Sequence, residues 1–182
     1  MIYKSLANEE KWIIKGIPIL FIISSAIHSL YNLTSKCILF AIIAPSNESI
    51  WEHSKMVILP IILWYSLYYI AKRKDKKIDI NKWSTAMLSS LIISIVSIFI
   101  VFYLYFGMFG GHYLWADILT LFIAILLGQL LALHIYRKGK GISFKLILVF
   151  TTIILLAYLI LTFFPPHIPL FKDFSIGIYG IA

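Results

Sequence analysis

Five long apolar stretches limit this chain to very few architectures. They run from about 12 to 32, 56 to 71, 85 to 107, 113 to 136 and 144 to 164. A helix of about 20 apolar residues rises about 30 Å, which is the thickness of the hydrocarbon core of a bilayer. Only 13% of the 182 residues are charged, too few to cover a soluble domain of this size. We therefore predict an all-α integral membrane protein, with one domain over residues 1–182 and a bundle of five transmembrane helices.

Two further segments are apolar without being long enough to cross. "CILFAIIA" at 37 to 44 is too short for a span, and we expect it to be re-entrant or interfacial, just before the second span. Pro165 and Pro166 end the fifth helix. The tail beyond them is too apolar for a disordered segment, so we expect it to pack back on the outer face of the bundle.

The basic loops set the expected orientation. Residues 71–82 and 136–145 hold most of the sixteen basic residues, and the positive-inside rule places such loops in the cytoplasm. The N-terminus, with Lys4, Lys11 and Lys15, should lie on the same side, so five crossings put the C-terminus on the extracytoplasmic side of the cell membrane. Because the basic residues come in short runs with no continuous basic face, the net charge of +8 indicates topology in the lipid bilayer and excludes nucleic acid as a partner.

Polar residues collect on the expected outer face, most densely in "NESIWEHSK" at 47 to 55. On a helix beginning there, Glu48 and Glu52 are four residues apart and their carboxylates repel each other. A shared metal, a proton held by one carboxyl, or an ion pair with Lys55 would relieve that repulsion. The alternative interpretation is a capped, solvated helix start with Trp51 in the interfacial aromatic belt.

Other outer segments carry groups that could join this stretch. His28 lies near the end of the first span with Ser24 one turn below it, as a ligand or as a hydrogen-bonded residue of the bundle interior. Asp117 lies about a turn into the fourth span and should point inward toward a partner. His112 can meet Asp117 only if the glycines of "GMFGG" let the backbone fold over. His167 follows the two prolines and would be held over the bundle.

These groups together indicate a metal-dependent site, with zinc as the expected ion. Three histidine or carboxylate ligands leave a coordination position open for water, whose pKa then falls to about 7. The expected metal ligands are His28, His53, His112 and His167. The expected catalytic carboxylates are Glu48, Glu52 and Asp117. The expected substrate contacts are Asn47, Trp51, Trp115 and Asp173. Neither Ser24 nor Cys37 has a base at a fixed spacing that would make it a nucleophile.

The chain resembles a family of small bacterial integral membrane proteins of unknown function. The resemblance rests on "NESIWEHSK", "LWADI", "LGQ" and "FFPPHIPLFKDFSIGIYG" and covers nearly the whole chain. A weaker similarity is to the membrane hydrolases that include alkaline ceramidases and adiponectin receptors, which bind zinc through three intramembrane histidines near a serine and an aspartate. Ser24 and His28 match the serine-to-histidine spacing of those enzymes, and Asp117 could be the acid. The departures are five spans in place of seven and no His-x-x-x-His pair.

Three functions fit this pattern. The first is a metal-dependent hydrolase or acyl transferase that acts on a lipid-linked substrate at the extracytoplasmic face. The second is a small transporter, or a solute-binding or ion-binding membrane subunit, that uses the same polar pocket. The third is a structural or immunity-type partner protein. An enzyme should keep its ligand and lose turnover when Glu52 or Asp117 becomes the amide, whereas a binding protein should lose affinity.

Overall fold

The computed structural model describes residues 6–75 and 78–181, so Lys4 lies outside the described part. Five helices are long and apolar enough to cross a membrane. The helices are α1 (Asn8–His28), α2 (Leu30–Leu33), α3 (Ile50–Ser54), α4 (Ile58–Lys72), α5 (Ile80–Phe109), α6 (Leu114–Lys138) and α7 (Phe144–Phe163), with short 3-10 turns η2 (Phe40–Ile42), η3 (Lys55–Val57), η4 (Arg73–Asp75) and η5 (Pro169–Phe171). The all-α fold is confirmed.

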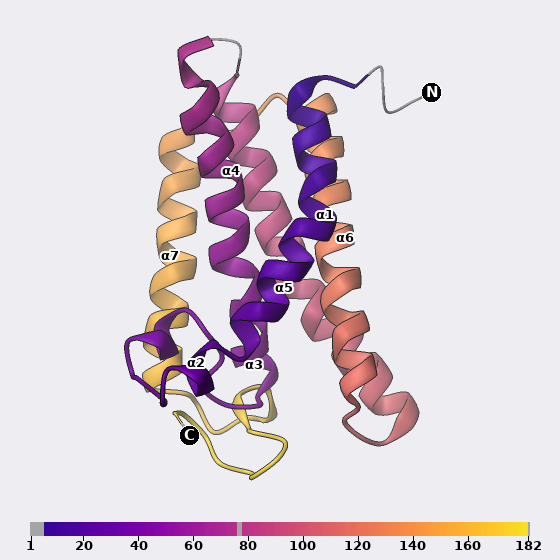
Figure 1. The fold of residues 1–182 in the computed structure, drawn as a ribbon, viewed down its shortest axis with the longest axis vertical. Coiled ribbons are helices and arrows are strands. Elements are labelled where there is room, and N and C mark those ends of the chain that lie inside the picture. Colours follow the sequence, from indigo (N-terminus) through magenta and orange to yellow (C-terminus); the bar gives the residue numbers. More distant parts are fainter. Residues whose placement is uncertain (1–5, 76–77, 182) are drawn as a thin grey trace.

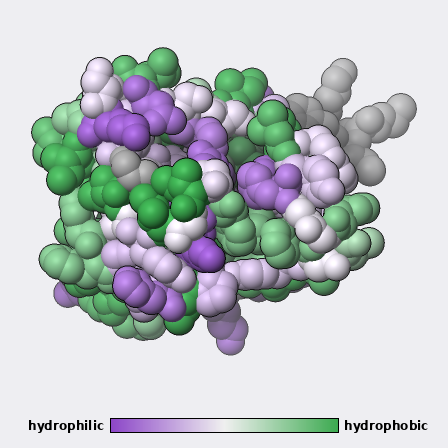
Figure 2. All heavy atoms as spheres, turned by 90° about the horizontal axis from the view of Figure 1, so that it is seen from below, coloured by the Kyte–Doolittle hydropathy of each residue, from purple (hydrophilic) through white to green (hydrophobic). Residues whose placement is uncertain are grey.

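The long helices run up and down and give the molecule two chemically different ends (Figure 1). The basic connections from α4 to α5 and from α6 to α7 lie at the same end as the start of α1. The opposite end carries α2, α3, the α5–α6 turn and the C-terminal tail. We call these the lysine end and the histidine end. Figure 2 looks at the histidine end, where hydrophilic residues lie among hydrophobic ones.

The second long helix begins earlier than the apolar pattern predicts. It starts at Ile50, and the 3-10 turn at Lys55–Val57 joins α3 to α4 within one continuous candidate span, Ile50–Lys72. The N-cap is Ser49, whose hydroxyl accepts a hydrogen bond from the backbone N–H of Glu52. The helix therefore begins after Glu48, which places the two glutamates in different surroundings.

The segment at 37 to 44 and the tail cover the histidine end. Residues Phe40–Ile42 form one 3-10 turn, with Ala41 and Ala44 buried. The tail folds over beside them, and its Phe171 packs against Trp51 at a centroid distance of 4.8 Å. The tail is thus packed on the bundle, and the depth of segment 37 to 44 in a bilayer stays a prediction.

Close packing joins α4, α5 and α6 between the histidine end and the lysine end. Gly128 of α6 faces α5 so closely that a Cβ there would lie 2.8 Å from the Ser90 carbonyl oxygen. Gln129 accepts a hydrogen bond from Tyr65 of α4 and donates one to Ser90 of α5. Small residues and buried amides join apolar helices in this way, because they permit close approach and directed polar contacts. These contacts fix the positions of the helices that carry the site at the histidine end.

Candidate metal centre

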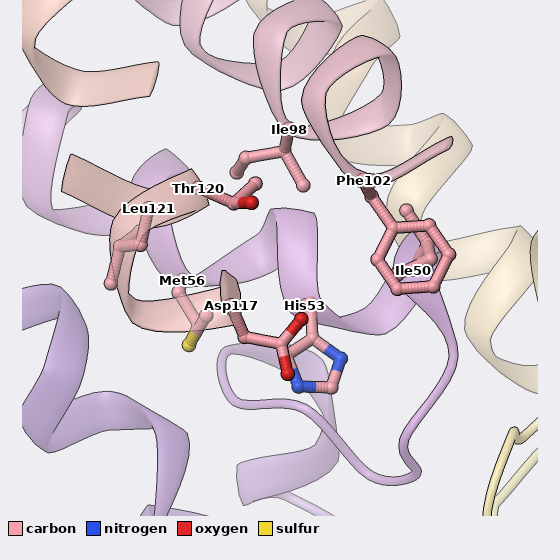
Figure 3. A pocket seen from close by; sticks show the side chains of 8 residues that line it. All are labelled: Ile50, His53, Met56, Ile98, Phe102, Asp117, Thr120 and Leu121. Carbon is pink, nitrogen blue, oxygen red and sulfur yellow. The ribbon is translucent and has the colours of Figure 1, made fainter. Parts of the chain in front are cut away.

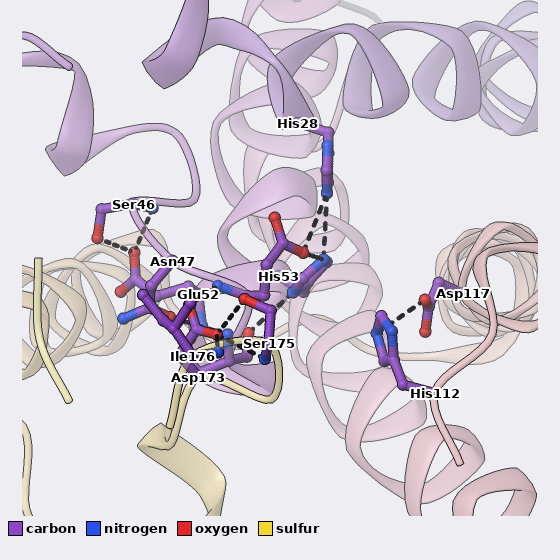
Figure 4. Close-up of polar contacts among 12 residues, drawn as sticks. His28, Ser46, Asn47, Glu52, His53, His112, Asp117, Asp173, Ser175 and Ile176 are labelled. Carbon is purple, nitrogen blue, oxygen red and sulfur yellow. Dashed lines mark hydrogen bonds and ion pairs between the residues drawn. The ribbon is translucent and has the colours of Figure 1, made fainter. Parts of the chain in front are cut away.

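Two histidines and a glutamate from separate segments meet at the histidine end. His28 is the last residue of α1, His53 lies in α3, and Glu48 precedes α3 by two residues. The Nε2 atoms of the histidines are 3.2 Å apart (Figure 4). Glu48 Oε2 lies 3.2 Å from the His53 Nε2 and 3.8 Å from the His28 Nε2. These three ligand atoms, which we call the triad, all lie within 4.8 Å of one another.

The triad has the dimensions of a zinc site. Two ligands at about 2.05 Å from a tetrahedral zinc ion are about 3.3 Å apart. Two sides of the observed triangle are 3.2 Å and the third is 3.8 Å. A shift of about 0.5 Å in one exposed side chain brings the third side to the ideal value. At least one of the two imidazole nitrogens carries a proton or shares a metal ion with the other atoms, because two imidazole nitrogens and a carboxylate oxygen would otherwise face one another lone pair to lone pair.

The surrounding hydrogen bonds fix the orientation of two members of the triad. His53 Nδ1 lies 2.9 Å from the carbonyl oxygen of Ser49, to which it donates. That bond leaves Nε2 as the nitrogen that faces the triad, an arrangement shared by nearly all metal-bound histidines. The backbone N–H of Glu48 donates to the Asp173 carboxylate at 2.9 Å, so the tail fixes Glu48 from behind.

The Glu48 carboxylate is ready to act as an anionic ligand. Its hydrogen bond with His53 holds the pKa of Glu48 below the ordinary value of 4.5, against the opposing effect of burial. The positive charge of an imidazolium or a metal ion near that oxygen acts in the same direction. Glu48 is therefore ionised at neutral pH.

Glu52 lies apart from the triad and belongs to a separate buried network. Its Oε2 accepts hydrogen bonds from the backbone and hydroxyl of Ser46 and lies 2.5 Å from Lys55 Nζ. Thr162 of α7 donates to Oε1, and Lys55 also donates to the Ala41 carbonyl. Glu52 is 2% exposed. Because the helix begins after Glu48, the two glutamates do not share one helix face, and the ion pair with Lys55 is the partner that Glu52 has in the structure. Glu52 contacts this network and not the triad, and its catalytic role stays a prediction.

A second polar pair faces the same hollow as the triad. The Asp117 carboxylate lies 2.9 Å from His112 Nε2, and its other oxygen accepts a hydrogen bond from the Tyr105 hydroxyl. The αL residue Gly110 ends α5 and starts the turn that brings His112 back to α6. His112 thus meets Asp117, so the condition set by the sequence, that the glycine-rich turn folds over, is fulfilled. His112 was expected to be a metal ligand, but it pairs with a carboxylate beside the triad and is not one of the three clustered ligand atoms.

Two cavities connect these groups. A hollow of about 400 Å³ is lined by His28, Glu48 and His53 on one side and by His112 and Asp117 on the other. A smaller cavity of about 20 Å³ adjoins His53 and Asp117, which is room for one water molecule (Figure 3). Thr120 lines it, and its hydroxyl has no hydrogen-bond partner among the described residues. A water there would bond that hydroxyl.

The remaining expected site residues lie outside the hollow. Asn47 donates to the Gly180 carbonyl, and Asp173 accepts from Glu48, Ser175 and Ile176, so both dock the tail. Trp51 stacks on Tyr158 at 4.2 Å inside the bundle, whereas Trp115 is 56% exposed. His167 is exposed and stacks on Tyr179 within the tail, away from the triad. The substrate contacts expected of the first four stay predictions, and His167 is not among the three ligand atoms that come together.

Sequence reasoning missed two residues that orient the site. Ser49 caps α3 and fixes His53 through its carbonyl. The Ser49-x-x-Glu52 spacing is a known helix-start pattern, so this signal was present in the sequence. Tyr105 holds Asp117 from the neighbouring helix. Tyrosines are common in this chain, and nothing local distinguishes Tyr105 from the others.

The Asp173 carboxylate should hold the tail in a pH-dependent way. Burial opposes ionisation of Asp173, but hydrogen bonds from Ser175, Glu48 and Ile176 outweigh it and lower its pKa below 3.8. A lowered pKa stabilises the docked tail at every pH above the unfolded value, and the stabilisation is lost as pH falls through the folded value. Wild-type protein should therefore keep residues 172–180 protected from hydrogen exchange down to about pH 4.

The variant Asp173→Asn should be cut by trypsin after the exposed Lys172 at least about tenfold faster at pH 7.5, because it loses bonds to a charged acceptor. Asp79→Asn is the matched control, since Asp79 caps α5 at the lysine end and does not touch the tail. Equal cleavage of both variants would show that Asp173 does not dock the tail.

Comparison with known proteins gives one match. A family model described as "Family of unknown function (DUF6512)" matches residues 1–181. No curated protein and no solved structure matches the chain.

Proposed function

The chain belongs to this family of unknown function, DUF6512, and from the geometry of its own site we propose that it is a zinc-dependent membrane hydrolase. The observation that carries the proposal is the triad of His28, Glu48 and His53, with zinc-like spacing and with the second nitrogen of His53 already bonded to a backbone carbonyl. Three protein ligands leave the fourth position to water, which is the pattern of catalytic rather than structural zinc.

The five long helices support a multi-pass protein with the site near one membrane surface. Lysines and arginines flank the connections at the lysine end, which is then cytoplasmic by the positive-inside rule. The start of α1 lies at that end, and the tail and triad then lie on the extracytoplasmic side. Because the hollow combines a polar end with apolar walls, a lipid-linked ester or amide suits it better than a freely soluble substrate.

The polar pair supplies proton transfer opposite the triad. Asp117 accepts the N–H of His112 Nε2, which leaves Nδ1 of His112 to take a proton. A zinc ion held by His28, Glu48 and His53 would supply an activated water, and His112 would take the proton that this water loses as its oxygen bonds to the carbonyl carbon of the substrate. The bond from that carbon to the leaving oxygen or nitrogen then breaks, and the proton passes to the leaving atom. The products are a carboxylic acid and an alcohol or amine.

An acyl transferase would follow the same route with an alcohol or amine in place of water. A transporter or ion-binding subunit would use the triad for binding alone. A transferase would differ from the hydrolase because it turns over only when an acceptor alcohol or amine is added. A binding protein would differ from both because it shows no turnover even when every site holds a metal ion.

The Asp117→Asn variant separates catalysis from binding. The amide can still contact His112 but loses the charge that stabilises its protonated form, so hydrolysis should fall about 10²- to 10⁴-fold. Zinc affinity should stay within about threefold of wild type, because Asp117 is not in the triad. The measurement is release of fluorophore from a long-chain fluorogenic ester by zinc-loaded protein in detergent, beside zinc titration of the same sample.

A control for that experiment is Asp79→Asn, which removes a carboxylate at the lysine end. It should retain both zinc and turnover. Zinc-loaded wild-type protein that hydrolyses none of a panel of acyl esters and amides would overturn the hydrolase and leave ion binding as the function of the triad.

A further inference from the structure

The hollow at the triad continues as an apolar groove between α1 and α6. On α1 it is lined by Phe21, Ser25 and His28, and on α6 by Leu114, Asp117, Ile118 and Leu121. Phe21 and His28 are seven residues apart, so the groove extends about 10 Å along the helix from the triad. Leu114 to Leu121 spans the same length on α6. The groove therefore has a polar end at the triad and an apolar end deeper in the bundle.

The two helices close the groove at its deep end. Phe21 packs edge-on against Phe122 of α6, with ring centroids 5.6 Å apart. Toward the histidine end α1 and α6 separate, as Figure 1 shows. The buried residues Met56 and Leu121 form the floor. Phe21 lines the groove, so its contact with Phe122 closes the groove at the end away from His28.

The rim of the groove faces outward from the bundle. Leu114 is 73% exposed and Ile118 is 50% exposed. Ser25 on the opposite wall is exposed as well. Exposed aliphatic side chains on helices of this length are those that contact lipid. A molecule can therefore enter the groove sideways from the bilayer without crossing water.

We propose that this groove holds one acyl chain of the substrate, whose ester or amide group lies at the triad. This inference rests on the proposed function. It names the substrate class as a lipid whose ester or amide bond to one acyl chain is cleaved. A volume of about 400 Å³ is near the lower end of the range of about 300–1,000 Å³ for ligand pockets, so the groove has room for one chain and not for a whole two-chain lipid. The chain lies against Phe21, Ile118 and Leu121, and the head group lies over the histidine end.

A photoactivatable lipid tests the groove directly. The probe is a lysophospholipid with a diazirine near the end of its single acyl chain, added to purified protein in detergent micelles. Labelling of the peptides that contain Phe21 and Ile118 should saturate and should be displaced by the same lysophospholipid without the diazirine. The variant Ser25→Trp places an indole in the groove and should reduce that labelling at least about fivefold.

The matched control is Ile22→Trp, which adds the same bulk to an exposed position of α1 that does not line the groove. It should retain saturable labelling. Labelling that does not saturate, or that both tryptophan variants reduce equally, would overturn the acyl-chain site. Zinc content is measured in the same samples. Zinc without saturable labelling overturns this inference alone, whereas saturable labelling without zinc leaves the groove and removes the proposed hydrolase.

Discussion

Replacing His53 by alanine should lower the affinity for zinc more than about 100-fold. His53 is the central member of the triad and its proposed ligand, since its Nε2 is 3.2 Å from the His28 Nε2 and from the Glu48 Oε2 and its Nδ1 is fixed by the Ser49 carbonyl. Loss of an outer-shell partner alone costs about 10- to 100-fold in metal affinity, and loss of a ligand itself costs more. Competition with a chromophoric zinc chelator measures this affinity in detergent.

The other two ligands give a graded series with a clear control. His28→Ala and Glu48→Gln should each weaken zinc binding strongly, because two protein ligands cannot hold the ion as three do. His134→Ala is the matched control, since His134 lies on α6 toward the lysine end and outside the triad. It should bind zinc as wild type does. Equal affinities for His53→Ala and His134→Ala would contradict the assignment of the triad.

Replacing Glu52 by glutamine should destabilise the protein by about 3–5 kcal/mol. The change leaves Lys55 as an unpaired charge in a site where it is 2% exposed. Replacing both partners, as in Glu52→Gln with Lys55→Met, should recover most of that loss, because it removes the stranded charge along with the pair. Reversible unfolding by denaturant in mixed micelles measures these differences in the free energy of unfolding.

The half-exposed ion pair between Glu10 and Arg137 provides the comparison. Glu10→Gln breaks a pair whose arginine side chain is 39% exposed, and such pairs contribute at most about 1 kcal/mol. A loss in Glu52→Gln no larger than in Glu10→Gln would contradict the structural role of the buried network. Folded Glu52→Gln should still bind zinc, because Glu52 does not contact the triad.

The five long helices could be predicted from the sequence because the pattern that sets them is local. About 20 consecutive apolar residues satisfy their own backbone hydrogen bonds only as a helix. The helix starts and ends are less certain, and α3 shows why: Ser49 takes the N-cap, although Ser46 and Asn47 are equally good capping residues. That shift of a few residues separates Glu48 from Glu52.

The sequence predicted which kinds of residue gather at the candidate site, but it did not predict which of them contact one another. The sequence indicated that histidines and carboxylates gather at one end, and His28, Glu48 and His53 do meet there. It named Lys55 as one of three possible partners for the glutamates and made the His112–Asp117 contact depend on the glycine-rich turn, but it could not choose among these alternatives. The choice depends on side-chain directions set by contacts with α7 and α5. The tail residue Asp173 acts at a distance of 125 positions, through the backbone of Glu48. Such pairings follow from the packed bundle.

X-ray absorption at the zinc edge, on purified protein loaded with one equivalent of zinc, tests the triad most directly. The account predicts two imidazole nitrogens at about 2.0–2.1 Å and oxygen ligands at about 2.0–2.2 Å. In Glu48→Gln the oxygen shell should change while the imidazole signal remains. A spectrum with no imidazole scattering, or with a sulfur ligand at about 2.3 Å that points to Cys37, would contradict the proposed metal centre.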